Sequence, residues 1–157
     1  YCNKAACPAG EMILSLFGEH SKKNVSYSNK LCQALALIGM SQDIHEDLLK
    51  NRLYIPSTEM KKFALKKSDI KKRAFNHNWK MFKAPWLKRI ELLLNQGRPL
   101  GKNVTGRLKL QIKVLIAGAE LLVKRLKKED CDWFKNPPKL SKLDWSILLV
   151  KIIINKK

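Results

Sequence analysis

Apolar residues recur every three or four positions along much of this chain, which is the period of an amphipathic helix. The first clear run predicts a helix over residues 28–53, because Ser28 can cap its start and Pro56 follows its end. A short apolar stretch at residues 11–17 predicts only one or two helical turns. We therefore expect an all-α protein, a compact bundle of about four to five amphipathic helices.

Two longer runs follow, and both carry basic residues on their polar sides. The first predicts a helix from Ser57 or Thr58 to about residue 95, with Pro85 expected to kink it or split it near Lys83. The second predicts a helix over residues 105–128. We expect the two helices to present parallel basic tracks that bind an anionic surface. The track residues are Lys62, Lys66, Arg73, Lys80, Lys109, Lys113 and Lys124.

The C-terminal segment, residues 140–157, has an ambiguous period. It is either a helix or an extended strand, because its apolar run is rich in β-branched residues. Two roles stay open: a terminal element packed on the core, and an exposed membrane-seeking segment flanked by lysines. The run is too short to span a bilayer, which needs about 20 residues. The residues assigned to a membrane contact are Trp79, Trp86, Trp145, Ile147, Leu148, Leu149, Ile152, Ile153 and Ile154.

Length and composition add one feature to this picture, a large positive net charge. The 157 residues favour one domain, with residues 1–26 as an N-terminal extension, and 45% apolar content is enough for a core. The chain has 32 Lys and Arg against 13 Asp and Glu, a net charge of +19, and most of the excess lies in residues 56–128. We therefore expect a polyanionic partner: nucleic acid, an anionic membrane surface or an acidic glycoprotein.

Four cysteines and two glycosylation sequons, at Asn24 and Asn103, favour a secreted protein over a cytosolic one with free thiols. Up to two disulfides are expected, in any of three pairings. The cysteines are Cys2, Cys7, Cys32 and Cys131. None of them forms a CxxC pair, and the three histidines are scattered, so we expect no metal site and no cofactor.

Catalytic motifs are not recognisable in the sequence. It has no nucleophile elbow, no phosphate-binding glycine loop and no HExxH motif. The four acidic residues of the basic middle form no acid–base pair on one helix face, and His77 near Trp79 is typical of a structural histidine. The residues therefore predict a non-enzymatic protein with no small-molecule substrate.

Five short motifs follow one another in the basic middle. They are Ser57-Thr58-x-x-Lys61-Lys62, Lys71-Lys72-Arg73, His77-Asn78-Trp79, Trp86-Leu87-Lys88-Arg89-Ile90 and Gly97-Arg98-Pro99. Their order resembles the second helix of the abalone sperm lysin family. With gaps, the similarity extends over residues 27–133.

The resemblance implies a helical bundle stored in the sperm acrosomal vesicle and secreted at the egg. Its partner would be the egg plasma membrane or an egg-coat glycoprotein, and it would be a monomer or a homodimer. The cysteines, Pro85, the apolar C-terminal run and the mass of 18.1 kDa favour promotion of sperm–egg membrane fusion. Two alternatives stay open: stoichiometric dissolution of the egg vitelline envelope, and a basic helical nucleic-acid-binding protein. The cysteines and sequons, which favour secretion, disfavour the second.

Overall fold

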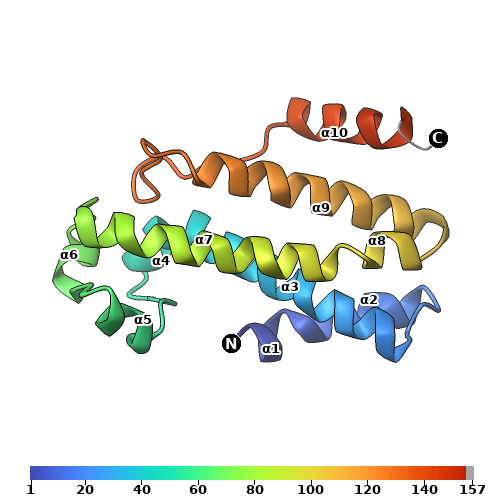
Figure 1. Cartoon of the computed structure of the whole chain (residues 1–157), viewed down its shortest axis with the longest axis horizontal. Coiled ribbons are helices and arrows are strands. Elements are labelled where there is room, and N and C mark those ends of the chain that lie inside the picture. The colour runs from blue at the N-terminus through green and yellow to red at the C-terminus, as the bar shows by residue number, and fades with distance from the viewer. Residues whose placement is uncertain (155–157) are drawn as a thin grey trace.

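Three long helices lie side by side and define the molecule, which is described by a computed structural model for residues 1–154 (Figure 1). They are α3 (Lys22–Gln42), α7 (His77–Gly97) and α9 (Gly106–Leu126). The shorter helices are α1 (Cys2–Ala5), α2 (Cys7–Leu16), α4 (Ile44–Leu49), α5 (Ser57–Lys62), α6 (Lys67–Lys71), α8 (Leu100–Asn103) and α10 (Lys142–Ile154). No strand occurs within this range, so the expectation of an all-α bundle is confirmed.

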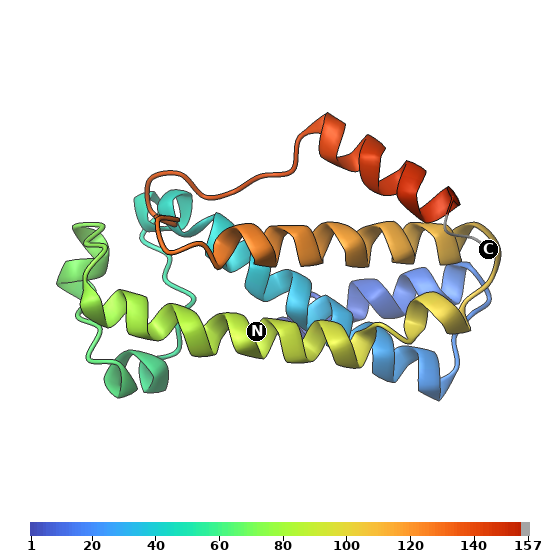
Figure 2. The same ribbon diagram turned by 45° about the horizontal axis from the view of Figure 1, so that its top comes forward.

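The core lies where the three long helices meet. Leu31 of α3, Ile90 of α7 and Val123 of α9 are almost completely buried there. One end of the core is aromatic, because Trp79 packs against Phe134 with ring centroids 4.4 Å apart. The view in Figure 2 shows that α10 lies outside this group, on the outer side of α9.

The first predicted helix is divided in two. It begins at Lys22, because Ser21 caps it by accepting a hydrogen bond from Asn24 N at 3.1 Å. It stops at Gln42, since Asp43 leaves helical geometry with φ −95° and ψ 4°, and α4 continues in a new direction. This break places the residues of the α3–α4 junction at the surface of the bundle.

The predicted helix from residue 57 is three helices. Ala64 and Arg73 adopt left-handed φ values of 49° and 56°, which end α5 and α6. α7 starts afresh at His77, where the Asn76 side chain accepts a hydrogen bond from Trp79 N. Pro85 does not split α7, which continues to Gly97.

Residues 1–26 are part of the packed fold. α1 and α2 lie against α3, and Leu14 is buried in the common core. Glu19 accepts hydrogen bonds from Thr105 N at 2.8 Å and from Thr105 Oγ1 at 2.6 Å. The N-terminal segment therefore holds the start of α9 in place.

A buried lysine fastens the chain that follows α9. Lys83 of α7 is 6% exposed, and its ammonium group donates to Cys131 O at 2.7 Å and Lys128 O at 3.3 Å. It also lies over the rings of Phe75 and Trp133. Desolvation lowers the pKa of Lys83. This arrangement directs residues 131–139 back across the bundle.

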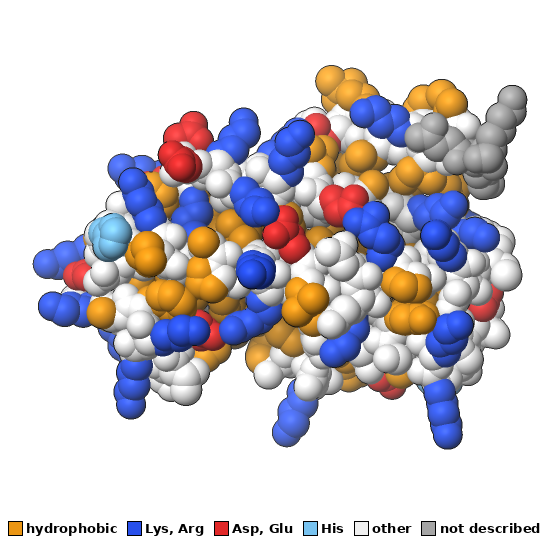
Figure 3. Space-filling view, viewed as in Figure 1, with side chains coloured by type: hydrophobic (Ala, Val, Ile, Leu, Met, Phe, Trp, Pro, Cys, Tyr) orange, Lys and Arg blue, Asp and Glu red, His pale blue; other side chains and the backbone are white. Residues whose placement is uncertain are grey.

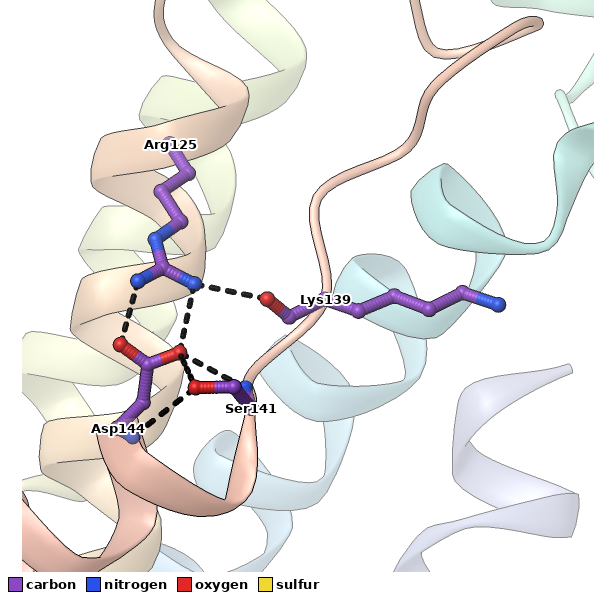
Figure 4. Close-up of polar contacts among 4 residues, drawn as sticks. All are labelled: Arg125, Lys139, Ser141 and Asp144. Carbon is purple, nitrogen blue, oxygen red and sulfur yellow. Dashed lines mark hydrogen bonds and ion pairs between the residues drawn. The ribbon is translucent and has the colours of Figure 1, made fainter.

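Polar contacts at its N-terminus attach α10 to α9 (Figure 4). The guanidinium of Arg125 pairs with both carboxylate oxygens of Asp144 and donates to Lys139 O at 2.7 Å. Ser141 and Asp144 also cap the helix reciprocally, with Ser141 N donating to Asp144 Oδ2 at 2.7 Å and Asp144 N to Ser141 Oγ at 3.1 Å. Hydrogen bonds from Arg125 and Ser141 hold the pKa of Asp144 well below its usual range.

Candidate functional site

Two carboxylates flank the break between α3 and α4. Asp43 is the junction residue, and Asp47 lies one helical turn further on, with its backbone N donating to Asp43 O at 2.8 Å. Both line a shallow pocket together with Met40 and Tyr54. The fold therefore places two acidic groups on one side of the junction, facing the same space.

The charge of this pair is incompletely neutralised by the protein. Desolvation raises the pKa of Asp43, and the like charges of Asp47 and Glu46 raise it further, while Lys139 and Lys50 act in the opposite direction. Among the described residues, no ion pair involves Asp43 or Asp47. Such a pair favours a bound cation.

Asp47 also lines a second, narrow cleft that runs into the aromatic end of the core. Met40 and Tyr54 line both spaces, so the two adjoin. The walls of the narrow cleft are Ser41, Ile44, Arg52, Leu53, Ile55, Trp79, Phe82, Trp86 and Trp133. The site thus combines two carboxylates at its mouth with a tightly packed aromatic interior, whose free volume of about 10 Å³ holds about one water molecule.

A tight turn brings Arg52 to this cleft. Asn51 adopts a left-handed φ of 55°, which asparagine tolerates, and Arg52 N donates to Asp47 O at 2.7 Å. The guanidinium of Arg52 is exposed and lines the same cleft as the Asp47 carboxylate. The Arg52 guanidinium and the Asp47 carboxylate, which carry opposite charges, therefore line the same cleft.

Two further contacts hold the cleft in shape. Trp86 Nε1 donates to Ser41 Oγ at 3.0 Å, and Ser41 Oγ donates to Leu37 O at 2.8 Å, so this wall of the cleft is fixed by hydrogen bonds. On the other side, His45 Nδ1 donates to Phe134 O at 2.7 Å. Residues 131–139 are thereby anchored to the α3–α4 junction.

A complete protein-built metal site is absent from residues 1–154, because no group of three or more His, Cys, Asp or Glu side chains converges there. Asp43 and Asp47 can supply two oxygen ligands. Magnesium is commonly bound by one or two carboxylates together with substrate phosphate oxygens and water. The pair therefore fits a cation that arrives with a phosphorylated ligand.

The residues predicted to form basic tracks are only partly brought together. Lys109, Lys113 and Lys124 share α9, as expected. Lys62 ends α5, Lys66 and Arg73 flank α6, and Lys80 lies on α7, so these four form no single stripe. The cause is the pair of left-handed residues that divide the predicted helix.

The residues predicted to contact a membrane separate into two groups. Trp79 and Trp86 are buried in the core, so that prediction is wrong for them in this arrangement. Trp145, Ile147, Leu149, Ile153 and Ile154 of α10 are exposed, and Leu148 and Ile152 are half-buried. Among the described residues, no helix is long and apolar enough to cross a membrane.

All four cysteines are free thiols in the structure, so the expected disulfides are not formed. Desolvation raises the pKa of Cys7, Cys32 and Cys131, which keeps these thiols protonated at neutral pH. Asn24 is buried, and its amide donates to Glu19 O at 2.9 Å, which leaves no room for a glycan there.

The carboxylate pair is not among the sequence-predicted residues, because it lies before the basic middle of the chain, where the candidate acid–base residues were expected. The signal is the run Asp43-Ile44-His45-Glu46-Asp47, with three acids in five positions of a strongly basic protein. Spacing of four residues places two side chains on one helix face. That run, with Arg52 nearby, is the sequence feature that marks the site.

Comparison with known proteins identifies related chains. A family model described as squalene/phytoene synthase matches residues 1–144. The phytoene synthase of Mycobacterium tuberculosis is 32% identical over 66 residues, which are 42% of this chain and 22% of that protein. The presqualene diphosphate synthase of Sinorhizobium fredii is 32% identical over 69 residues, 44% of this chain and 25% of that protein.

A solved structure agrees with these matches. The squalene synthase HpnC from Alicyclobacillus acidocaldarius superposes with a TM-score of 0.77 at 29% identity, over 81% of this chain and 48% of that one. This chain thus spans about half the length of that solved synthase, and its alignments cover about a quarter of the two curated relatives.

These matches overturn the expected resemblance to sperm lysins. The named relatives are synthases, and none is a fertilisation protein. The expectations of sperm–egg fusion, envelope dissolution, nucleic-acid binding and secretion from the acrosomal vesicle are therefore wrong. Also wrong are the expectations of a non-enzymatic role, of egg membrane or egg-coat partners, and of no small-molecule substrate. The lysin motifs were short, and residues 57–73, which carry two of them, form no continuous helix.

Proposed function

The chain belongs to the squalene/phytoene synthase family, and on that premise we propose that its α3–α4 junction binds the diphosphate group of an isoprenoid diphosphate. The observation that carries this is the position of Asp43 and Asp47 at the mouth of an aromatic-lined cleft. An isoprenoid diphosphate has one highly charged end and one long apolar end. The acidic mouth suits the charged end once a cation bridges the like charges, and the aromatic side chains behind it would have to move apart to admit the apolar chain.

Magnesium is the cation that suits this chemistry. Asp43 and Asp47 would hold it, and oxygens of the diphosphate and water would complete its coordination. Magnesium supplies charge neutralisation, which makes the diphosphate a better leaving group. Desolvation and, after it, repulsion from Asp47 and Glu46 raise the pKa of Asp43, and a bound cation would relieve that repulsion.

The remaining groups of the cleft have separable roles. Arg52 can bind phosphate oxygens in a bidentate manner, which orients the diphosphate at the mouth. The rings of Trp79, Phe82 and Trp86 exclude water from the apolar end. Departure of the diphosphate leaves positive charge on the isoprenoid carbon, and aromatic faces stabilise such charge.

The test measures binding of farnesyl diphosphate to the full chain by calorimetry, with and without magnesium. We expect binding that requires magnesium and that weakens about tenfold or more in Asp43→Asn and Asp47→Asn, because each loses a charged ligand. Glu129→Gln is the matched control, since this exposed acid lines neither of the two spaces that Asp43 and Asp47 line and should leave affinity unchanged. Equal affinity of the wild type and both Asp variants would refute the assignment.

A further inference from the structure

One wall of the narrow cleft belongs to no helix. Of the residues that line the cleft, Trp133 is the one side chain that is buried and lies outside a helix. The other buried walls are on α3, α4 and α7, and the hydrogen bond from Trp86 to Ser41 joins α7 to α3. Packed helices joined in this way yield less readily than a connecting segment. An apolar chain that enters the cleft is therefore expected to displace Trp133 first.

The position of Trp133 depends on the ammonium group of Lys83. This group donates to Cys131 O and Lys128 O, which precede Trp133 in the chain, and it lies 5.4 Å from the centroid of the Trp133 ring. The ring has a hydrogen bond of its own, from Nε1 to Leu126 O at 3.3 Å. Lys83 therefore links α7 to this wall at two points, the backbone of the segment and the ring.

A buried lysine is a costly way to make this link. In Figure 3, Lys and Arg side chains project from much of the surface in view. Lys83 differs, since it is the one charged residue that is buried among residues 1–154, and desolvation lowers its pKa. An apolar side chain of similar size would fill the same space without the desolvation cost. What the lysine adds is direction, because its bonds fix one position of Cys131 and Trp133.

We propose that Lys83 is a positioning residue for the apolar chain of the substrate: its bonds hold the Trp133 wall where that chain packs against it. The inference rests on the proposed function, in which the chain enters between the aromatic side chains. Without these bonds, the segment around Trp133 would have to be ordered each time a ligand binds, and the entropy lost would weaken binding. The diphosphate end binds at Asp43 and Asp47, which Lys83 does not contact, so its affinity should not change.

Two ligands separate the apolar chain from the charged end. Calorimetry with magnesium measures binding of farnesyl diphosphate and of inorganic pyrophosphate to the full chain. We expect Lys83→Met to weaken farnesyl diphosphate about tenfold and to leave pyrophosphate within about twofold, because only the first ligand needs an ordered wall. A lysine that merely stabilised the fold would change both affinities equally or neither. Either of those results would overturn the proposal.

Lys83→Arg tests whether the donors themselves are needed. The open space that Lys80, Leu87 and Lys127 line beside Lys83 leaves room for the larger head group. Because a guanidinium can also donate to both carbonyl groups, this variant should bind farnesyl diphosphate within about threefold of wild type. A loss as large as that in Lys83→Met would contradict a role for these hydrogen bonds.

Lys80→Met is the matched control. Lys80 lies on the same helix and its ammonium group is 5.3 Å from the centroid of the Phe75 ring, which Lys83 also covers, at 5.0 Å. Lys80 is exposed, however, and makes no hydrogen bond to the segment around Trp133 within the part of the chain that the structure describes. Both affinities should stay unchanged. A selective loss of farnesyl diphosphate binding here would assign the effect to lost charge and overturn the proposal.

Hydrogen exchange of the wild type tests the same wall without a substitution, which matters if Lys83→Met does not fold. With magnesium, farnesyl diphosphate should slow exchange of the amides of residues 128–136 severalfold more than pyrophosphate does. Equal protection by the two ligands would overturn the proposal, because the apolar chain would then not reach this wall. A wild type that binds neither ligand would refute the substrate site itself. Binding of both without a difference in Lys83→Met would refute only the role of Lys83.

Discussion

At the scale of single residues, Gly97 shows how closely two helices approach. A Cβ at this position of α7 would lie 2.8 Å from Leu31 N and 3.1 Å from Leu31 Cα, which are backbone atoms of α3 that cannot rotate away. We expect Gly97→Ala to lower the free energy of unfolding by about 1–3 kcal/mol, as overpacking does. Denaturant titration measures this.

Gly39 provides the matched control. It also lies in a helix, α3, but a Cβ there would meet no atom within 4 Å. Gly39→Ala should therefore raise stability by up to about 1 kcal/mol, because alanine favours the helix. Destabilisation of similar size in both variants would show that the α3–α7 contact is not the cause.

The ionised carboxylate of Asp43, which is proposed to bind a cation, is expected to lower the stability of the fold when no cation is bound. Its pKa is raised in the folded protein, so the ionised form is disfavoured there at neutral pH and the protonated form is favoured. Asp43→Asn should therefore give a slightly higher Tm than wild type at pH 7 without magnesium. The difference should shrink as pH falls and vanish below the ordinary aspartate pKa of about 3.9, where the carboxyl is neutral in both states.

Thermal melts of the two proteins from neutral to acidic pH test this relation. Glu129→Gln, whose side chain is exposed, serves again for comparison and should follow the wild type at each pH. A lower Tm for Asp43→Asn at neutral pH would mean that the carboxylate stabilises the fold, contrary to the expected effect of desolvation and carboxylate repulsion.

At the scale of elements, α10 depends on its first turn. Asp144 caps the helix with Ser141 and pairs with Arg125, and its lowered pKa means that this stabilisation persists until the pH falls below the usual aspartate range. We expect Asp144→Ala to make amides of residues 142–154 exchange with solvent severalfold faster. Exchange in α3 and α7 should not change.

Ser146→Ala is the control for this experiment. Ser146 lies on the same helix and is exposed, and its hydroxyl bonds only to Lys142 O one turn earlier. Its removal should leave α10 attached. Unchanged exchange in Asp144→Ala would show that packing of Trp145 on Gly118, and not the polar contacts, holds α10 in place.

Helices were predictable to different degrees for identifiable reasons. The helix predicted over residues 105–128 matches α9, because its leucine period runs unbroken to the end. The prediction of one helix from residue 57 is wrong because Ala64 and Arg73 adopt left-handed conformations, which neither residue type favours. The form of α10 was left open, although Ser141-x-x-Asp144 before an apolar run is the sequence signature of a helix start.

At the scale of the whole molecule, the net charge indicated a different region from the proposed site. The excess of basic residues between 56 and 128 is spread over five helices. The proposed site instead combines Asp43 and Asp47 of the α3–α4 junction with Trp79 and Trp133, which are far away in sequence. Periodicity identified the helices but not their tertiary contacts, so it could not predict a cleft that forms between them.

Residues 131–139 connect the acidic α3–α4 junction with the start of α10. His45 holds Phe134 O and Gln42 holds Pro138 O beside the acidic junction, while Arg125 holds Lys139 O beside the start of α10. Between these attachments, Trp133 and Phe134 are buried in the core and Lys83 donates to Cys131 O. Ordering of this segment from one end reduces the conformational entropy still to be lost at the other, and such coupling is reciprocal. A ligand that tightens this segment at the acidic junction would then also tighten the start of α10, and loss of the α10 contacts would weaken binding of the ligand by the same factor.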